Sequence, residues 1–599
     1  MNPHVYKRIE FFLISLLIFS AFLFLFVLRG IDDNSLTSWL WTFSDFNIIG
    51  FSLIIISGII FAYMLTRLSR LQVALTFPKF SSSIFLFLLS FVSVMPFWKV
   101  PEVIVDASRY FTQAKHLDVY GIGYFLKEWG RDINIWTDMP LIPFFYGLIF
   151  KLFGESRIYI QAFTTLLFSL TVVLTYNIGK TLWDETVGFY GGLLLLGIPY
   201  LFSQIPLMLV DVPAMFFLTL SIFTYSKALT RGGMWIGFSS IAIFLAFFSK
   251  YSTWLMLSVL IVIFVVYVVQ HLDKSGVKSK GTGGSKSQRE FGVQSTSNYL
   301  CRAFVVAFTS CLLIGIFFWY KLDVFSEQIR LLTTFQKPGL RRWEESFIST
   351  FFFQIHPIIT VSAAYSAYVA LKRRDIKYAI ISWLIIFILL FQIKRIRYII
   401  MIFPQLALMA SYGLQEIRDR RIVRFIVSCT VIFSLLIAVL AYLPFLRNTS
   451  AVNIKSAGNF LNSLDASEIE VFTLQAKNQE VNPAVSVPIL DLFTKKQIIY
   501  HYDKDFSPPL MDFEKSPLRF TWEYKNPEYY AVIPSNPPLL KRGRGDFQVK
   551  TAVIVIASDI EQSFPPHIEQ RTNEYSKSKV FKVSEGVFRF RTVVKVYYN

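Results

Sequence analysis

Residues 11–28 read FFLISLLIFSAFLFLFVL, an apolar run without a single charged side chain. A helix needs about 20 apolar residues to span a bilayer, so this run is long enough to cross a membrane. Lys7 and Arg8 precede it as they would in a signal peptide, but no small-residue cleavage site follows. We interpret the run as a first membrane helix.

Further apolar runs follow along the chain, and polar residues separate each from the next. They cover residues 48–66, 83–98, 158–178, 187–203, 211–226, 234–249, 252–270, 301–320, 350–371, 377–393, 398–414 and 425–443. Together with the first run they predict a mainly α polytopic membrane protein of about 13 transmembrane helices.

The composition supports this class of protein. Of the 599 residues, 54% are apolar but only 17% are charged, whereas about a quarter of the residues of a soluble globular protein are charged. This excludes a disordered chain, a nucleic-acid-binding tail protein and an ordinary cytosolic enzyme. In a membrane protein a net charge of +19 is expected to reflect basic loops on one side of the membrane, and it does not indicate a nucleic-acid partner.

Lysine and arginine concentrate in every second loop. If the N-terminus is cytoplasmic, the cytoplasmic loops carry Arg67, Arg70, Lys79, Lys180, Lys227, Arg231, Lys274, Lys278, Lys280, Lys286, Arg289, Lys372, Arg373, Arg374, Arg418, Arg420, Arg421 and Arg424. The positive-inside rule then predicts a cytoplasmic N-terminus and, after an odd number of spans, an extracytoplasmic C-terminus in a bacterial or archaeal plasma membrane. Leu141–Phe153 is too short to span easily, and we expect an interfacial helix there.

The chain is predicted to divide into three parts. Residues 1–82 are an N-terminal extension with two transmembrane helices, 83–446 are a membrane domain with a large outer loop at 99–157, and 447–599 are a small extracytoplasmic soluble α/β domain. Strands are predicted in that last part at 470–474, 497–502, 552–557 and 587–598, and a basic surface loop at 537–544. The Gly-, Ser- and Lys-rich stretch 275–295 predicts a flexible cytoplasmic loop.

Ionisable residues at the outer ends of the helices are the functional candidates, because burying charge near a bilayer is costly. Asp106, Arg109 and Tyr110 are spaced i, i+3 and i+4 and so share one face of a helix. A helix N-cap with a local ion pair explains Asp106 equally well from spacing alone. Asp138 and Asp211 each precede a proline by two residues, and for both the spacing alone favours an ordinary helix start.

Cations also lie on the predicted outer side. The pentapeptide KRIRY puts Lys394, Arg395 and Arg397 in a very short outer loop, against the positive-inside bias. Misassigned topology is one explanation, and a phosphate or pyrophosphate site is the other, because arginine forks suit these oxygens. Lys250, between two spans, is either a snorkelling lysine or part of that site. Three cations of the loop 321–349 could join it: Lys321, Arg341 and Arg342.

Metal and disulfide patterns are weak in this sequence. There is no HExxH or paired-His pattern, and Cys301, Cys311 and Cys429 lie in apolar runs without ligand spacing. The sequence therefore supports no protein metal cage, and a divalent ion stays open as a possible cofactor.

Six blocks, in this order, resemble those of a known family. They are Asp106-x-x-Arg109-Tyr110, 139–154 (MPLIPFFYGLIFKLFG), 179–184 with 188–192 (GKTLWD and GFYGG), Pro199 with 209–213 (LVDVP), 244–251 (FLAFFSKY) and 397–404 (RYIIMIFP). Together they resemble integral-membrane glycosyltransferases of the GT-C fold. Within that fold they are most similar to the dolichyl-phosphate-mannose–protein mannosyltransferase and lipid A aminoarabinose transferase group.

The resemblance implies transfer of a sugar from a polyprenyl-phosphate donor to an extracytoplasmic acceptor, which could be protein, glycolipid or polysaccharide. It implies that Asp106 is the base that takes the acceptor's proton and that Asp211 is a second acidic site. Cations must stabilise the leaving lipid phosphate, and a single displacement predicts inversion at the anomeric carbon. The substrate-binding residues that it implies are Arg109, Tyr110, Asp138, Lys250, Tyr251, Lys394, Arg395, Arg397 and Tyr398.

The chain departs from the family pattern at a few positions. Relatives often carry a basic residue where this chain has Met139, and a glutamate after the essential acid where it has Ala107. These departures put a metal site at those positions in doubt. Two helices also precede the family's usual first span.

Other classes of membrane protein compete with this interpretation. A transporter or flippase for lipid-linked saccharides commonly pairs broken helices around a midplane site, whereas the ionisable residues here cluster at one membrane face. A polysaccharide polymerase would not require the first outer-loop block and the 209–213 block together. A structural protein with a sensor tail leaves the outer 394–397 cluster unexplained.

Overall fold

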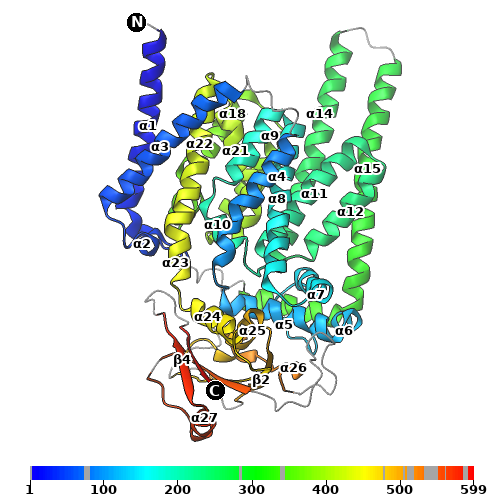
Figure 1. The fold of residues 1–599 in the computed structure, drawn as a ribbon. Helices are drawn as coiled ribbons and strands as arrows, with labels where there is room; N and C mark the ends of the chain where they lie inside the picture. Colours follow the sequence, from blue (N-terminus) through cyan, green and yellow to red (C-terminus); the bar gives the residue numbers. More distant parts are fainter. Residues whose placement is uncertain are drawn as a thin grey trace.

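The computed structural model describes residues 3–72, 81–281, 286–336, 345–476, 479–503, 506–508, 518–531, 551–559, 561–583 and 591–599. A long helical bundle makes up most of the molecule, and a small sheet domain lies at one end of it (Figure 1). The loop predicted at 537–544 and the cations Arg341 and Arg342 lie outside the described residues.

Each of the predicted spans corresponds to a helix, or to a pair of helices, in the bundle. These helices are α1 (Pro3–Val27), α3 (Ile48–Gln72), α4 (Ser82–Val94), α8 (Arg157–Leu182), α9 (Glu185–Leu195), α10 (Pro199–Gln204), α11 (Asp211–Arg231), α12 (Met234–Phe247), α13 (Tyr251–Met256), α14 (Val259–Gly281), α15 (Lys286–Tyr320), α18 (Pro357–Arg373), α19 (Tyr378–Leu390), α21 (Phe403–Leu414) and α22 (Arg420–Ile437). Within the described ranges, nine segments are long and apolar enough to cross a membrane unaided. A polytopic membrane fold, as predicted, follows from this architecture.

Several predicted spans are interrupted, and the sequence gives a physical reason. The span 187–203 breaks between α9 and α10, where a Cβ added to Gly197 would lie 2.8 Å from Thr430 Cγ2 and where Pro199 starts the second piece. The span 350–371 is a π-helical turn, Ser349–Ile355, followed by α18, whose first residue is a proline. Proline lacks a backbone N–H and begins helices well but interrupts them when internal.

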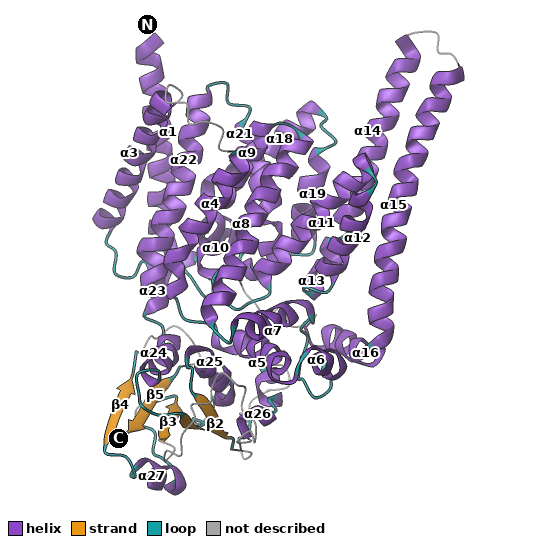
Figure 2. Cartoon of the chain, turned by 45° about the vertical axis from the view of Figure 1, so that its right-hand side comes forward, coloured by secondary structure: helices purple, strands orange, loops and turns teal. Residues whose placement is uncertain are grey.

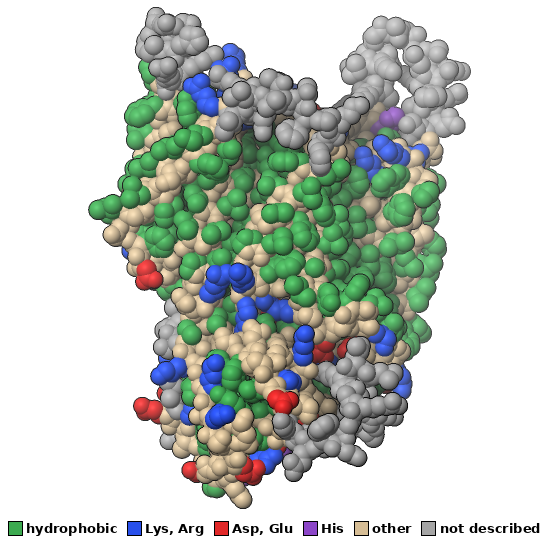
Figure 3. Space-filling view, in the orientation of Figure 1, with side chains coloured by type: hydrophobic (Ala, Val, Ile, Leu, Met, Phe, Trp, Pro, Cys, Tyr) green, Lys and Arg blue, Asp and Glu red, His purple; other side chains and the backbone are tan. Residues whose placement is uncertain are grey.

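The two ends of the bundle differ. The N-terminus lies at one end and the sheet domain at the other (Figure 1). Hydrophobic side chains cover the middle of the face drawn in Figure 3, and blue basic groups lie above and below this band. At the N-terminal end α14 and α15, like α1, extend beyond the rest of the bundle (Figure 2). The prediction of a flexible loop at 275–295 is therefore wrong for 275–281 and 286–295, which continue these two helices. Such polar segments can be helical because Lys and Gln are good helix formers.

Three helices lie between the bundle and the sheet domain: α5 (Ile104–Tyr120), α6 (Ile122–Glu128) and α7 (Leu141–Phe153) (Figure 1). The predicted interfacial helix is α7, and it packs against α5. Gly147 makes this contact close, because a Cβ there would lie 2.8 Å from the backbone oxygen of Ala114. α16 (Leu322–Leu331) lies beside α6 in the same layer (Figure 2).

The last part of the chain folds as an α/β domain. After α23 (Leu443–Arg447) come α24 (Ala451–Leu461), β1 (Glu468–Thr473), α25 (Ser486–Phe493), β2 (Gln497–His501), α26 (Glu528–Ala531), β3 (Thr551–Ala557), α27 (Pro566–Thr572), β4 (Lys577–Phe581) and β5 (Val593–Tyr598). The strand order is β2-β1-β3-β5-β4, with the first three parallel and the last two antiparallel to their neighbours. β3 is central and buried on both faces, which explains its continuous apolar sequence.

The N-terminal hairpin of α1 and α3 packs against α22 and forms its own aromatic cluster, centred on Phe22, Trp39, Phe51 and Phe433. Its connecting loop is fixed at the same end of the bundle as the sheet domain. There the buried carboxylate of Asp32 accepts hydrogen bonds from the Ser349 hydroxyl and the Gln354 amide, among others.

Candidate active site

Asp106 lies in the first turn of α5, close to the bundle. The N-cap of this helix is Val103, so the N-cap interpretation of Asp106 is wrong, although a carboxylate in a first turn is still favoured by the helix dipole. Its Oδ1 is 3.3 Å from Arg109 Nη2, the local pair expected from the i, i+3 spacing. Its Oδ2 lies 2.5 Å from Nη1 of Arg397, which is 291 residues further along the chain.

Arg397 lies between two acids. It belongs to the short helix α20 (Ile396–Ile399), and its Nε is 2.9 Å from Oδ2 of Asp211. Asp211 is the first residue of α11 and only 1% exposed, and its other oxygen forms an ion pair with Lys250 Nζ. Asp211 thus does start a helix, but its carboxylate is used for these two cations rather than for capping, and Lys250 points to Asp211 rather than snorkelling.

A second branch starts at Arg109. Its Nη2 is also 3.2 Å from Oδ1 of Asp138, and Asp138 Oδ2 accepts a hydrogen bond of 3.0 Å from the Gln113 amide. The Tyr110 hydroxyl also donates to Asp138. Six charged side chains therefore form one continuous row, which we call the ion-pair chain: Lys250, Asp211, Arg397, Asp106, Arg109 and Asp138.

Position along the ion-pair chain gives two of its acids opposite properties. Burial raises the pKa of Asp106, but Arg397 and Arg109 outweigh burial and hold this pKa below its usual range. At Asp138 burial dominates and the charge of Asp106 adds to it, so the pKa rises to about 6 in spite of Arg109. Asp106 is thus a permanent anion, whereas Asp138 can carry a proton near neutral pH.

The predicted cationic loop lies next to this chain. The Tyr398 ring is 5.5 Å from Lys250 Nζ and 5.4 Å from the Arg395 guanidinium, so it lies between two cations. Arg395 is also 3.8 Å from Oε1 of Glu345, whose other oxygen accepts a hydrogen bond from the Ile396 N–H. Lys394 is exposed, and its carbonyl accepts a hydrogen bond from Thr350.

Two predicted residues, Lys321 and Tyr251, are not members of the ion-pair chain. Lys321 was expected among the phosphate-binding cations, but its Nζ donates to the carbonyls of Lys127 and Trp129 and so fixes the start of α16 to the outer loop. Tyr251 starts α13 next to Lys250, and its hydroxyl is buried without a hydrogen-bond partner among the described residues.

Sequence reasoning missed several residues of the site: Gln113, Gln328, Glu345 and Phe520. The two glutamines look like ordinary helix residues in the sequence, and Phe520 comes from the C-terminal domain, with its ring 4.3 Å from the Arg109 guanidinium. Glu345 can be recognised as a candidate in the sequence, because it is an acid in the predicted outer loop 321–349, beside the cations Arg341 and Arg342.

The arrangement is suited to an anionic substrate and to proton transfer, and the described residues hold no cluster of three His, Cys, Asp or Glu side chains that could bind a metal. Arg397 and Lys250 can bind phosphate oxygens if they leave their carboxylates. A carboxylate beside a bound phosphate can take a proton from a hydroxyl.

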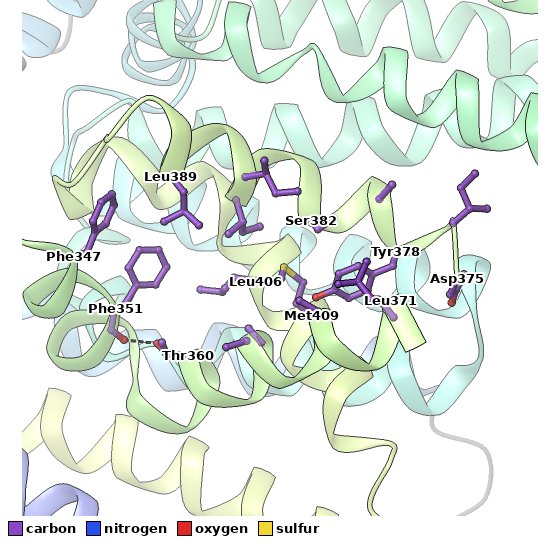
Figure 4. Close-up of a pocket in the computed structure, with 18 of the residues that line it drawn as sticks. Phe347, Phe351, Thr360, Leu371, Asp375, Tyr378, Ser382, Leu389, Leu406 and Met409 are labelled. Carbon is purple, nitrogen blue, oxygen red and sulfur yellow. Dashed lines mark hydrogen bonds between the residues drawn. The ribbon is translucent and has the colours of Figure 1, made fainter. Parts of the chain in front are cut away.

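A cavity of about 760 Å³ lies between α18, α19 and α21. Figure 4 shows that Phe347, Phe351, Leu389, Leu406 and Met409 point into it, and its walls are almost entirely apolar. Phe347 and Phe351 flank Thr350, which bonds the carbonyl of Lys394, so one end of the cavity adjoins the cationic loop.

Comparisons with known proteins show similarity to membrane glycosyltransferases in sequence and in fold. Residues 138–281 match the family model of dolichyl-phosphate-mannose-protein mannosyltransferase. The structure is similar to that of ArnT from Cupriavidus metallidurans in the apo state, with a TM-score of 0.51 and 12% identity. It is also similar to the same protein bound to undecaprenyl phosphate, with a TM-score of 0.50 and 12% identity. Both matches cover 86% of this chain and 97% of the other.

No curated protein matches the chain significantly. The identity to ArnT is too low to carry over more than the architecture. That architecture nevertheless extends over most of both chains, and the family match covers the outer-loop residue Asp138, Asp211 and Lys250. The chain thus has the GT-C fold of integral-membrane glycosyltransferases, and its residues 138–281 carry the sequence pattern of the dolichyl-phosphate-mannose-protein mannosyltransferase family.

Proposed function

We propose that the protein is a membrane glycosyltransferase that moves a sugar from a polyprenyl-phosphate donor to an extracytoplasmic acceptor, which is a protein, glycolipid or polysaccharide. The ion-pair chain carries this proposal. It puts a permanently ionised acid, Asp106, between two arginines at the end of a membrane bundle, where a lipid phosphate and a polar acceptor can meet. The family match and the ArnT-like fold support the same chemistry.

The donor phosphate would bind to the cations at one end of this chain. Lys250 and Arg395 both lie near the Tyr398 ring. Arg397 shares the carboxylate of Asp211 with Lys250. In the free protein a carboxylate neutralises each of these cations, Asp211 for Lys250 and Arg397 and Glu345 for Arg395. Phosphate oxygens replace those carboxylates as ligands, and the same cations then stabilise the charge that grows on the leaving phosphate.

Asp106 would act as the base. In the free protein Arg397 and Arg109 hold its pKa low, so it is a weak proton acceptor. When Arg397 turns to the donor phosphate, Asp106 loses its nearest cation and becomes a stronger base. It then takes the proton of the acceptor hydroxyl as that oxygen attacks the anomeric carbon. A single displacement of this kind inverts the anomeric configuration.

The isoprenoid chain of the donor would lie in the apolar cavity between α18 and α19. Its volume and its phenylalanine-rich end beside the Lys394 carbonyl suit a hydrocarbon chain whose phosphate reaches the cationic loop. The positive-inside rule supports an outer location for this end of the bundle, because short loops at the opposite end, such as 372–374 and 418–424, are rich in lysine and arginine.

A transporter or flippase is supported less well. Such proteins bind their substrate near the bilayer midplane between related halves of the molecule. In this structure the ion-pair chain lies at the end of the bundle next to α5 and the C-terminal domain (Figure 1), which suits chemistry at a membrane face.

The deciding experiment is sugar transfer by the purified, reconstituted protein from a defined polyprenyl-phosphate sugar. Asp106→Asn should lower the rate by about 10²- to 10⁴-fold, the usual contribution of a general base. Asp184→Asn is the matched control, because Asp184 caps α9 at the other end of the bundle and asparagine caps equally well. Normal turnover in Asp106→Asn would remove Asp106 as the base. Cytoplasmic labelling of a single cysteine at position 106, with the three native cysteines replaced, would overturn the topology.

A further inference from the structure

Two nearly inaccessible glutamines surround Asp138 and leave hydrogen-bonding atoms unused. Gln113 is 0% and Gln328 is 2% exposed. The Gln113 amide donates to Asp138 Oδ2, and the Gln328 amide donates to the carbonyls of Trp136 and Asp138 at 3.2 Å each. In both glutamines Oε1 is buried and has no partner among the described residues.

Two donors in the same place are also unused. Arg109 Nε and the Tyr251 hydroxyl are buried without partners in the described part of the chain. Arg109 forms an ion pair with Asp138, and Tyr251 interacts with it electrostatically. Leaving buried polar atoms unpaired costs stability and is rare in native proteins, so a group of four such atoms around one carboxylate calls for an explanation, such as a bound water, ion or ligand.

The unused atoms form a complementary set. Two are acceptors, the Oε1 atoms, and two are donors, the Arg109 N–H and the Tyr251 O–H. A sugar hydroxyl offers one O–H and two lone pairs, so neighbouring hydroxyls can satisfy donors and acceptors at once. Asp138 adds an acceptor when ionised. A phosphodiester has no donor for the two glutamine oxygens, and a hydrocarbon chain has neither donor nor acceptor.

We propose that Asp138, Gln113, Gln328, Arg109 and Tyr251 form the sugar subsite, which binds hydroxyls of the sugar carried by the polyprenyl phosphate. The inference rests on the proposed function and adds the sugar's location to it. The subsite lies at the Asp138 end of the ion-pair chain, whereas the phosphate-binding cations lie at the Lys250 end. Asp106 lies between them, where the anomeric carbon joins sugar to phosphate.

The C-terminal domain closes this subsite. Phe520, in the short turn Arg519–Glu523, packs over the Arg109 guanidinium at 4.3 Å and lies 5.9 Å from the Trp136 ring. The Asn134 amide donates to the Glu523 carbonyl at 2.8 Å and ties this turn to the outer loop. Phe520 therefore keeps water from Arg109 and makes the domain part of the sugar site.

The test measures binding of carriers to the full-length protein in lipid nanodiscs. The probes are undecaprenyl phosphate and undecaprenyl phosphate linked to mannose or to glucose. The wild type should bind at least one sugar-bearing carrier about tenfold tighter than the bare carrier. Gln113→Leu and Gln328→Leu should each lower this preference about fivefold and leave the affinity for the bare carrier unchanged.

Two further variants protect the test against misfolding. Gln204→Leu is the matched control, because Gln204 on α10 is likewise buried with an unpartnered Oε1, and it should keep the preference. Tyr251→Phe removes only an unpaired buried hydroxyl, so it should lower the preference while the melting temperature stays the same or rises.

The outcomes separate the two hypotheses. A wild type that binds all three carriers equally overturns the sugar subsite, and so do glutamine variants that are as selective as Gln204→Leu. If the wild type binds the bare carrier and transfers sugar, the proposed function stands whether or not the sugar subsite is overturned. A wild type that binds none of the carriers overturns the proposed function itself.

Discussion

Two buried charge clusters lie on opposite parts of α5, and they differ in how completely their charged groups are paired. At the start of the helix, Asp106 and Arg109 belong to the ion-pair chain, which keeps unpartnered atoms such as Arg109 Nε. Near its end, Lys115 forms ion pairs with Glu155 and with Asp491 of the C-terminal domain.

The second cluster has the character of a structural contact. Asp491 also accepts a hydrogen bond from the Tyr530 hydroxyl, and Lys115 Nζ lies 5.3 Å from the Tyr529 ring and 5.6 Å from the Phe111 ring. Burial lowers the pKa of Lys115, but Asp491 and Glu155 outweigh it, so the lysine stays charged. The same residue types thus serve docking where every charged group is paired, and substrate binding where a charged group, Arg109, keeps an unused N–H.

The largest effect is expected from Lys115→Met, which breaks the docking cluster. It leaves Asp491 and Glu155 buried without their cation, a loss that typically costs about 3–5 kcal/mol. We expect a lower melting temperature and faster proteolysis of the C-terminal domain, with Lys115→Met/Asp491→Leu recovering part of the loss. If Lys115→Met is as stable as the wild type, the two clusters do not differ as described.

Arg397→Lys tests the catalytic cluster without changing its charge. A lysine cannot reach Asp106 and Asp211 together as the guanidinium fork does, so we expect a 10²- to 10³-fold lower transfer rate and little change in stability. Arg373→Lys is the control, because Arg373 pairs with Glu416 in an exposed ion pair. Transfer within threefold of the wild-type rate in Arg397→Lys would contradict a bridging role.

The pH dependence of stability should distinguish Asp138 from the other members of the ion-pair chain. Its pKa is raised to about 6 in the folded protein, so the folded state binds more protons than the unfolded state between about pH 4 and 6. The stabilisation that comes from this proton is complete below about pH 4, and it is lost, by about 3 kcal/mol, as the pH rises through 6. The melting temperature should therefore fall over this range, and the fall should be smaller in Asp138→Asn, in which Asp32, whose pKa burial also raises to about 6, still contributes; the same slope in both proteins would refute the assignment.

Phe520→Ala should have the smallest effect. It exposes Arg109 to water without removing a charge, so we expect a three- to tenfold rise in KM for the donor with kcat nearly unchanged. Phe520→Tyr should restore the wild-type value, and Trp522→Ala, in the same turn but bonded to the Glu480 carbonyl, should leave KM alone. A change in kcat alone would argue against a role at the sugar subsite.

Much of the membrane fold could be predicted because hydropathy reports burial in lipid directly. The interfacial α7 also followed from length, since 13 residues are too few to span. The strand β4 was missed because its residues are mostly exposed and alternate without an apolar face. The helical extensions of α14 and α15 were missed because composition alone does not distinguish a polar helix from a loop.

The charged members of the site and the local pair of Asp106 and Arg109 were predictable, and the long-range pairing was not. Asp106, Asp211 and Arg397 were noticed because isolated charges at helix ends are costly near a bilayer. The contact between Asp106 and Arg397 joins residues 291 positions apart, and no local pattern encodes it. Gln113 and Gln328 carry no charge, so their importance depends on the neighbours that leave their oxygens unpaired.

The position of Arg397 in the chain has a consequence for biosynthesis. Ribosomes add about 5–20 residues per second, so the 291 residues that separate Asp106 from Arg397 take roughly 15–60 s to synthesise. During that time α5 and α11 are already made, while the arginine that joins their acids is still missing. The site is therefore completed only when α20 and α21 are inserted, and in a chain that stalls earlier Asp106 has only Arg109, and Asp211 only Lys250, as a neighbouring cation.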